Sequence, residues 1–233
     1  VFYKVIFFRQ LMHQSIINLN NIKSSVKANQ EKSNKRNNIK IIAVSKTFAI
    51  NHINPLIEHG HLDFGENKVQ EAVEKWTSVK SKNKNISLHL VGKLQSNKTK
   101  LALKIFDYIH SLDTEKLANK ISEEQKKIEK KPKLFIQVNI GNEDQKSGIN
   151  PNNLKTFYKY CLNKNLDIIG TMCLPPVSED SEKYFMRMNY LNKDLGLKEL
   201  SMGMSADYIP AVENNSTYIR IGSKIFGERK KRE

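Results

Sequence analysis

The chain has 233 residues, a formal net charge of +15 and 39% hydrophobic residues. This length suits a single α/β barrel and can bury a sizeable core. The chain has two cysteines, Cys161 and Cys173, without a CxxC motif or metal-ligand spacing. A disulfide framework is therefore not expected. The pattern indicates a reducing, cytoplasmic compartment in which both thiols are small buried side chains.

The positive charge raises nucleic-acid binding as one hypothesis. Lysine, asparagine and isoleucine are abundant along the whole chain, and basic residues fall in short runs such as KSKNKN, KKIEKKPK and RKKRE. A nucleic-acid surface would concentrate its charge on one face or element instead. Composition bias is the favoured explanation, and nucleic-acid binding is the alternative.

The opening segment, VFYKVIFF, is apolar but too short to span a membrane, and no cleavage site of small residues follows it. We expect residues 1–10 to be an extension outside the core and residues 11–233 to form one domain. No other apolar run is long enough to cross a bilayer. A helix is predicted from Met12 to about Asn29, because apolar residues recur there at spacings of three and four.

Beyond a polar loop, predicted strands and helices alternate. The strands are Lys40–Ser45, Leu62–Phe64, Ser87–Val91, Tyr108–Leu112, Leu134–Ile140, Asp167–Met172, Leu200–Gly203 and Tyr218–Ile221. The helices are Ile53–His59, Val69–Val79, Lys98–Lys104, one capped by Asp113 or Thr114, one opened by Pro151, Ser181–Leu195 and Ala206–Val212. Eight such repeats predict a closed (β/α)8 barrel. A doubly wound open sheet is the alternative, but it prefers a glycine-rich turn where this chain has SKTFAINH.

Functional residues of such a barrel follow its strands, at the carboxyl end. Ser205 precedes the helix expected from Ala206, so its hydroxyl and the first amides of that helix can meet a phosphate. Gly222 and Ser223 follow the last strand and offer amides to the same anion. A helix cap or a turn explains each residue singly, but together they indicate a phosphate site.

Arg220 interrupts the apolar strand YIRIG, and alternation places it on one face with Tyr218 and Gly222. A buried arginine requires a partner. The sequence leaves two partners open: a barrel carboxylate such as Glu66, or a bound cofactor.

Lys46 follows the apolar strand IIAVS. Partial burial lowers the pKa of a lysine and makes available the neutral amine that attacks a carbonyl. Opposite a phosphate site, this pattern suggests pyridoxal 5′-phosphate, although a solvated lysine is the commoner outcome. His59 and His61 have no third ligand nearby, so no metal is expected.

The chain resembles the YggS/PROSC family of pyridoxal-phosphate homeostasis proteins, which are similar to the barrel domain of alanine racemase. The resemblance runs from about Ile39 to Arg229. It rests on AVSKT, FGENKVQE, LHLVGKLQSNK, IHSLD, VNIGNEDQKSGI, MCLPP, LSMGMSADY and STYIRIGSKIFGER, in that order. It implies a TIM barrel of the alanine racemase N-terminal-domain type with an additional N-terminal helix. Leu88 stands where relatives carry tryptophan, a difference expected to affect packing more than chemistry.

The resemblance also implies a set of cofactor-binding residues: Lys46, Asn67, Ser205, Arg220, Gly222 and Ser223. Lys46 would carry pyridoxal 5′-phosphate as the internal aldimine, and Arg220 would lie near the pyridine nitrogen. The residues expected at the phosphate would bind it. His89 falls in another family motif near the cofactor, and its role stays open.

The implied function is a monomeric carrier in pyridoxal-phosphate homeostasis, with cofactor-dependent apoenzymes as candidate recipients. An amino-acid racemase is the alternative. A cation such as Arg220 makes the ring a weaker electron sink, which racemases tolerate, but they also need a second acid/base. In alanine racemase that group comes from an additional C-terminal domain. We expect it to be missing here, because the chain ends at Glu233.

Overall fold

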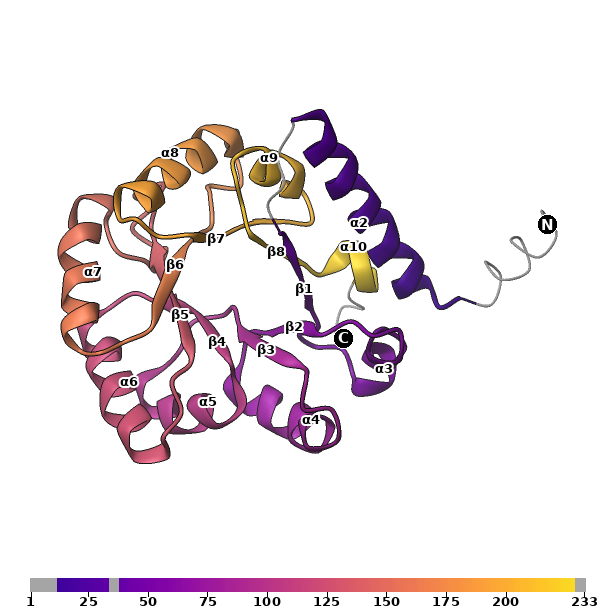
Figure 1. The fold of residues 1–233 in the computed structure, drawn as a ribbon, viewed down its shortest axis with the longest axis horizontal. Helices are drawn as coiled ribbons and strands as arrows, with labels where there is room; N and C mark the ends of the chain where they lie inside the picture. The colour runs from indigo at the N-terminus through magenta and orange to yellow at the C-terminus, as the bar shows by residue number, and fades with distance from the viewer. Residues whose placement is uncertain (1–11, 34–37, 229–233) are drawn as a thin grey trace.

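A computed structural model describes residues 12–33 and 38–228 of the chain. Eight parallel strands pair in sequence order, and the first pairs with the last to close a barrel. Figure 1 shows the helices as a ring outside these strands. The predicted (β/α)8 barrel is confirmed, and the alternative of a doubly wound open sheet is wrong.

The elements follow the predicted order with shifts of a few residues at their ends. The strands are β1 Lys40–Val44, β2 Asp63–Glu66, β3 Ser87–Leu90, β4 Tyr108–Leu112, β5 Lys133–Val138, β6 Ile168–Cys173, β7 Glu199–Met204 and β8 Tyr218–Ile221. The helices are α2 Gln14–Lys32, α3 Ile50–Glu58, α4 Val69–Lys82, α5 Thr99–Ile105, α6 Glu115–Ile128, α7 Leu154–Asn163, α8 Ser181–Asp194, α9 Tyr208–Glu213 and α10 Ser223–Phe226. Short 3₁₀ turns at Ser96–Lys98 and Pro151–Asn153 lead into α5 and α7.

Alternation along the strands divides the core into two parts. On β1, Ile42 and Val44 belong to the barrel interior, while Ile41 and Ala43 pack beneath the helices. The interior also contains the rings of Tyr108, Phe135 and Tyr218 together with Met172. Full burial of one aliphatic or aromatic side chain contributes about 1.5–3 kcal/mol, so the larger outer layer supplies most of the hydrophobic stabilisation.

Helix α2 closes the outer ring beside β8 and β1, between α9 and α10 on one side and α3 on the other (Figure 1). Its Leu19, Ile22 and Val26 are buried in the outer core. The Asn18 side-chain amide donates to the Ile225 carbonyl at 3.0 Å. The predicted N-terminal helix is therefore an integral layer of the barrel. The extension expected over residues 1–10 lies outside the described residues.

The two cysteines are buried and unpaired, as predicted. Burial raises the pKa of both thiols to about 12, so neither is a reactive thiolate at neutral pH. Among the described helices, none combines the length and the apolar character that crossing a membrane requires. Within the same residues, no group of three histidine, cysteine or acidic side chains is arranged to hold a metal.

Candidate functional site

The parallel register brings the predicted site residues from β1, β2 and β8 to one end of the barrel. Val44 pairs with Gly65, and Lys46 and Asn67 each follow their member of this pair by two residues. On the other side of β1, a Cβ built at Gly222 would lie 3.4 Å from the Val44 carbonyl oxygen. Lys46, Asn67 and Gly222 thus all follow strand ends at the carboxyl end of the barrel, as a barrel site requires.

The backbone on both sides of Lys46 is held by hydrogen bonds. The Ser45 amide donates to the Gly65 carbonyl at 2.9 Å, and Lys75 Nζ donates to the Ser45 carbonyl at 3.0 Å. The Thr47 amide donates to Glu71 Oε1 at 2.6 Å. Thr47 also has a φ of 69°, a left-handed conformation that costs a β-branched residue free energy. Lys46 itself is half-buried, so its position is fixed at the strand end.

Lys75 connects these bonds to Glu66, which is fully buried. Its Oε1 accepts hydrogen bonds from Ser45 Oγ at 2.7 Å, Lys75 Nζ at 2.9 Å and Trp76 Nε1 at 3.0 Å. We call Ser45, Glu66, Glu71, Lys75 and Trp76 the Glu66 cluster. The cluster lies between the strands and α4, because Glu66 alternates with the interior-facing positions of β2. The hypothesis that Glu66 forms a salt bridge with Arg220 is therefore wrong.

Arg220 lies on the same face of β8 as Tyr218, as alternation predicts. This face is the barrel interior, and Arg220 is 5% exposed. Its two terminal nitrogens donate to Ser201 Oγ at 2.6 Å and to the Cys173 carbonyl at 2.9 Å. Burial lowers the pKa of the guanidinium, although Cys173 and the Asp207 carboxylate act in the opposite direction. In the described part of the chain no carboxylate forms an ion pair with Arg220. A buried cation of this kind can interact with an acceptor on a bound ligand.

The expectation that Ser205 caps a helix starting at Ala206 is wrong. Helix α9 starts at Tyr208, because the Asp207 carboxylate accepts the Met204 amide at 2.6 Å and extends the preceding turn. The Ser205 hydroxyl instead accepts the Lys224 amide at 3.4 Å. This contact places Ser205 at the start of α10, beside Ser223, so the three predicted phosphate residues lie together for a different reason.

Asn67 lies at the edge of a cavity of about 300 Å³ that Gln137, Asn139 and Lys146 also line. Gly92 allows this approach: a Cβ there would lie 2.8 Å from the Asn67 Cα and collide with the neighbouring backbone. The cavity opens at the carboxyl end, where β2, β3, β5 and β6 end.

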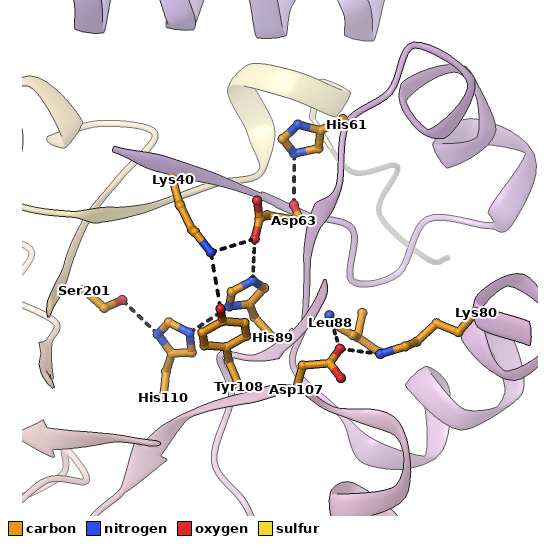
Figure 2. A network of polar contacts seen from close by, with 10 residues as sticks. All are labelled: Lys40, His61, Asp63, Lys80, Leu88, His89, Asp107, Tyr108, His110 and Ser201. Carbon is orange, nitrogen blue, oxygen red and sulfur yellow. Dashed lines mark hydrogen bonds and ion pairs between the residues drawn. The ribbon is translucent and has the colours of Figure 1, made fainter. Parts of the chain in front are cut away.

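His89 lies deeper than the sequence suggested. It is fully buried inside the barrel and contacts Asp63 and His110 (Figure 2). Sequence reasoning missed His110 and Ser201, which continue this contact toward Arg220. The available signal was alternation, which puts His110 on the same face of β4 as Tyr108.

The donors at the carboxyl end fit a small molecule that carries an aldehyde, an aromatic ring with an acceptor and a phosphate. Lys46 offers an amine, Arg220 a buried cation, and Ser223 an amide and a hydroxyl that make no hydrogen bond to any described residue. Backbone amides near glycine are suited to a phosphate, and an amine on a packed strand is suited to a carbonyl.

Comparisons with known proteins identify the family of the chain. The family model described as alanine racemase, N-terminal domain, matches residues 17–230. A pyridoxal phosphate homeostasis protein of Pasteurella multocida is 39% identical, covering 82% of this chain and 87% of its own. PipY of Synechococcus elongatus, solved without and with pyridoxal phosphate, is 30% identical. Its structure without the cofactor covers 92% of this chain and 100% of its own, with a TM-score of 0.82.

Alanine racemase itself is a more distant relative. The enzyme of Clostridium difficile is 18% identical, with a TM-score of 0.67, and the match covers 93% of this chain and 57% of the enzyme. That likeness shows the fold alone, whereas the relatives of higher identity are named for homeostasis. The chain therefore belongs to the family of pyridoxal phosphate homeostasis proteins, built on the N-terminal domain fold of alanine racemase.

Proposed function

We propose that this chain binds pyridoxal 5′-phosphate at the carboxyl end of its barrel and acts as a carrier in the homeostasis of that cofactor. It would hold the reactive aldehyde and so limit its concentration in solution. The observation that carries the proposal is Arg220, a buried cation with no ion-pair partner in the described chain, at the barrel end that also bears Lys46. The relatives' names and the PipY complex with pyridoxal phosphate support it.

In this proposal each residue has one task. Lys46 supplies the amine for the aldehyde, and the Glu66 cluster keeps its backbone in place. The Ser223 and Gly222 amides, with the Ser205 hydroxyl near them, bind the phosphate. Arg220 faces the ring nitrogen. Asn67 contacts the cofactor from the cavity that it lines at the carboxyl end. When bound, the cofactor supplies an electrophilic carbonyl and an electron-withdrawing ring.

Amino-acid racemisation is a second candidate, favoured only by the fold shared with alanine racemase. It would need an acid/base on the other face of the ring, for which we propose no residue of this chain. The carrier proposal predicts no exchange of amino-acid α-protons in deuterated water beyond that of the cofactor in solution. Faster exchange, removed by Lys46→Ala, would support a racemase.

The proposal also includes a single domain over residues 11–233, a monomeric state, a cytoplasmic location and transfer to cofactor-dependent apoenzymes. The unpaired, buried cysteines are compatible with a reducing compartment. Light scattering tests the monomer. A fluorescence titration at physiological salt tests the remaining nucleic-acid hypothesis, for which we expect no binding.

The cofactor site is tested by titrating the purified protein with pyridoxal 5′-phosphate and recording the visible spectrum. We expect a saturable band with the wild type and none with Lys46→Ala. Lys93→Ala is the matched control, because Lys93 is an exposed lysine at the same barrel end. A band that persists in Lys46→Ala, or that disappears equally in Lys93→Ala, would contradict the assignment.

A further inference from the structure

A continuous series of hydrogen bonds crosses the barrel interior and ends at Arg220. Asp63 Oδ1 lies 3.0 Å from His89 Nε2, and His89 Nδ1 lies 3.1 Å from His110 Nε2. His110 Nδ1 then lies 2.9 Å from Ser201 Oγ, which accepts from Arg220 at 2.6 Å. We call these five residues the histidine chain. Figure 2 shows its first four members as one connected line.

Aromatic rings seal the histidine chain from water. His89, His110 and Ser201 are each 0% exposed. His89 stacks on Tyr108 with ring centroids 4.3 Å apart, and His110 stacks on Phe135 at 4.2 Å. Buried polar groups must be paired, so each ring nitrogen needs its hydrogen-bond partner within the histidine chain. Asp63 is the most exposed of the five residues: its side chain is 20% exposed beside Lys40, at the amino end of the barrel.

The two ends of the histidine chain set the direction of its hydrogen bonds. Burial by itself would raise the pKa of Asp63, but the hydrogen bond from His89 and the nearby charge of Lys40 bring it below its ordinary value. Asp63 is therefore a carboxylate that only accepts. Arg220, at the other end, is a cation that only donates.

The histidines between these ends are neutral. Burial lowers the pKa of His89, although Asp63 partly opposes this effect. Burial lowers the pKa of His110 still further, with help from the neighbouring His89 and Arg220. A neutral imidazole has one N–H and one acceptor nitrogen. His89 must therefore donate from Nε2 to Asp63, and His110 must donate from Nε2 to His89 Nδ1.

The remaining acceptor, His110 Nδ1, then requires the Ser201 hydroxyl proton. This leaves the lone pairs of Ser201 Oγ for Arg220, so every donor in the histidine chain points from Arg220 toward Asp63. Reversing any one bond would leave two donors or two acceptors face to face. The whole arrangement thus has a single consistent set of proton positions.

We propose that Asp63, His89, His110 and Ser201 are positioning residues that orient Arg220 toward the carboxyl end. This inference rests on the proposed function for the identity of the ligand and deepens it for Arg220. A carboxylate in direct contact would neutralise the guanidinium and compete with a ligand for its N–H groups. The histidine chain gives Arg220 a fixed neutral acceptor and keeps the compensating carboxylate at the far end of the barrel.

The proton positions are tested by long-range ¹H–¹⁵N NMR of the histidine rings, in the protein without cofactor. We expect His89 and His110 to be neutral at pH 7, each with its proton on Nε2. A proton on Nδ1 of either ring, or an imidazolium, would overturn the proposal. This result is independent of cofactor binding, so it separates failure of the inference from failure of the proposed function.

Coupling along the histidine chain is tested by comparing Asp63→Leu with Asp63→Asn. Leucine removes the acceptor for His89. The NMR signals of the His110 ring, which is two hydrogen bonds away from residue 63, should therefore change. Affinity for pyridoxal 5′-phosphate should fall about tenfold, the low end of what losing an outer-shell partner costs at metal sites. Asparagine keeps an acceptor oxygen, so both measurements should stay near wild type.

Asp107→Leu is the matched control, because Asp107 pairs with Lys80 and the Leu88 amide but lies outside the histidine chain. It should leave the His110 signals and the affinity unchanged. If Asp63→Leu does not fold, Ser201→Ala tests the last link, with the same expected loss of affinity. Unchanged His110 signals and affinity in the Asp63→Leu protein, or unchanged affinity in Ser201→Ala, would overturn the positioning role.

Discussion

Two buried polar networks support the two halves of the proposed site, and they treat charge in opposite ways. In the Glu66 cluster, outside the strands, the anion and the cation touch, with Glu66 and Lys75 2.9 Å apart. In the histidine chain, inside the barrel, neutral groups separate Asp63 from Arg220. The direct pair of Lys75 with Glu66 and Glu71 holds the backbone of Ser45 and Thr47, on both sides of Lys46. Separation leaves a cation whose charge remains available to a ligand.

Replacing Glu66 by leucine is the most severe way to break the first network. It removes the shared acceptor of Ser45 Oγ, Lys75 Nζ and Trp76 Nε1, and leaves Lys75 with Glu71 as its carboxylate partner. We expect the loss of three hydrogen bonds to a buried charge to lower the free energy of unfolding by about 3–5 kcal/mol. Urea denaturation measures this loss. Glu71→Leu removes a partly exposed partner of the same lysine and should cost no more than about 1–2 kcal/mol. Equal losses in the two variants would show that Glu66 has no special role.

Mild acid should lower the free energy of unfolding, because buried histidines near Asp63 resist protonation. Burial lowers the pKa of His61, which contacts the Asp63 carbonyl, from 6.5 to about 4. Between these values the unfolded chain binds a proton that the folded chain excludes, so stability is present above pH 6.5 and is lost as the pH falls toward 4. His61 alone should account for about 3 kcal/mol. His89 and His110 act in the same direction.

The check is the free energy of unfolding measured at intervals from pH 7 to pH 4.5. His61→Gln should flatten the decline, whereas His59→Gln, which replaces an exposed histidine two residues earlier, should leave it unchanged. A decline that is identical in all three proteins would disprove the assignment to His61.

Thr47→Gly should have the smallest effect on stability. Glycine accepts the φ of 69° without strain but makes the unfolded chain more flexible, so we expect a change within about 1 kcal/mol. The loss of stiffness beside Lys46 should nevertheless weaken binding of pyridoxal 5′-phosphate severalfold. Unchanged affinity would show that the backbone conformation of Thr47 does not position Lys46.

The sequence was sufficient for the fold because each strand has local signals. Ile41–Val44 is a continuous apolar run of the kind buried on both faces of a barrel wall, and Thr114 caps α6 through the Leu117 amide, as predicted. The start of α9 was wrong, because the bond between Asp207 and Met204 belongs to a turn that no periodicity reveals.

The site was only partly predictable. Alternation placed Arg220 on the same face of its strand as Tyr218, and the structure shows that this face is the barrel interior, whereas Glu66 lies on the outer face of β2. The link from His89 to Ser201 depends on how far neighbouring strands are staggered, and that stagger appears only in the closed barrel. Chain-local patterns therefore identify the donors but not the network that orients them.

The most direct test of the central claim, that Lys46 holds the cofactor, is borohydride reduction of the protein loaded with pyridoxal 5′-phosphate, followed by peptide mass spectrometry. We predict one stoichiometric adduct, on Lys46. An adduct mainly on another lysine, or scattered over exposed lysines with Lys46 unmodified, would contradict the account.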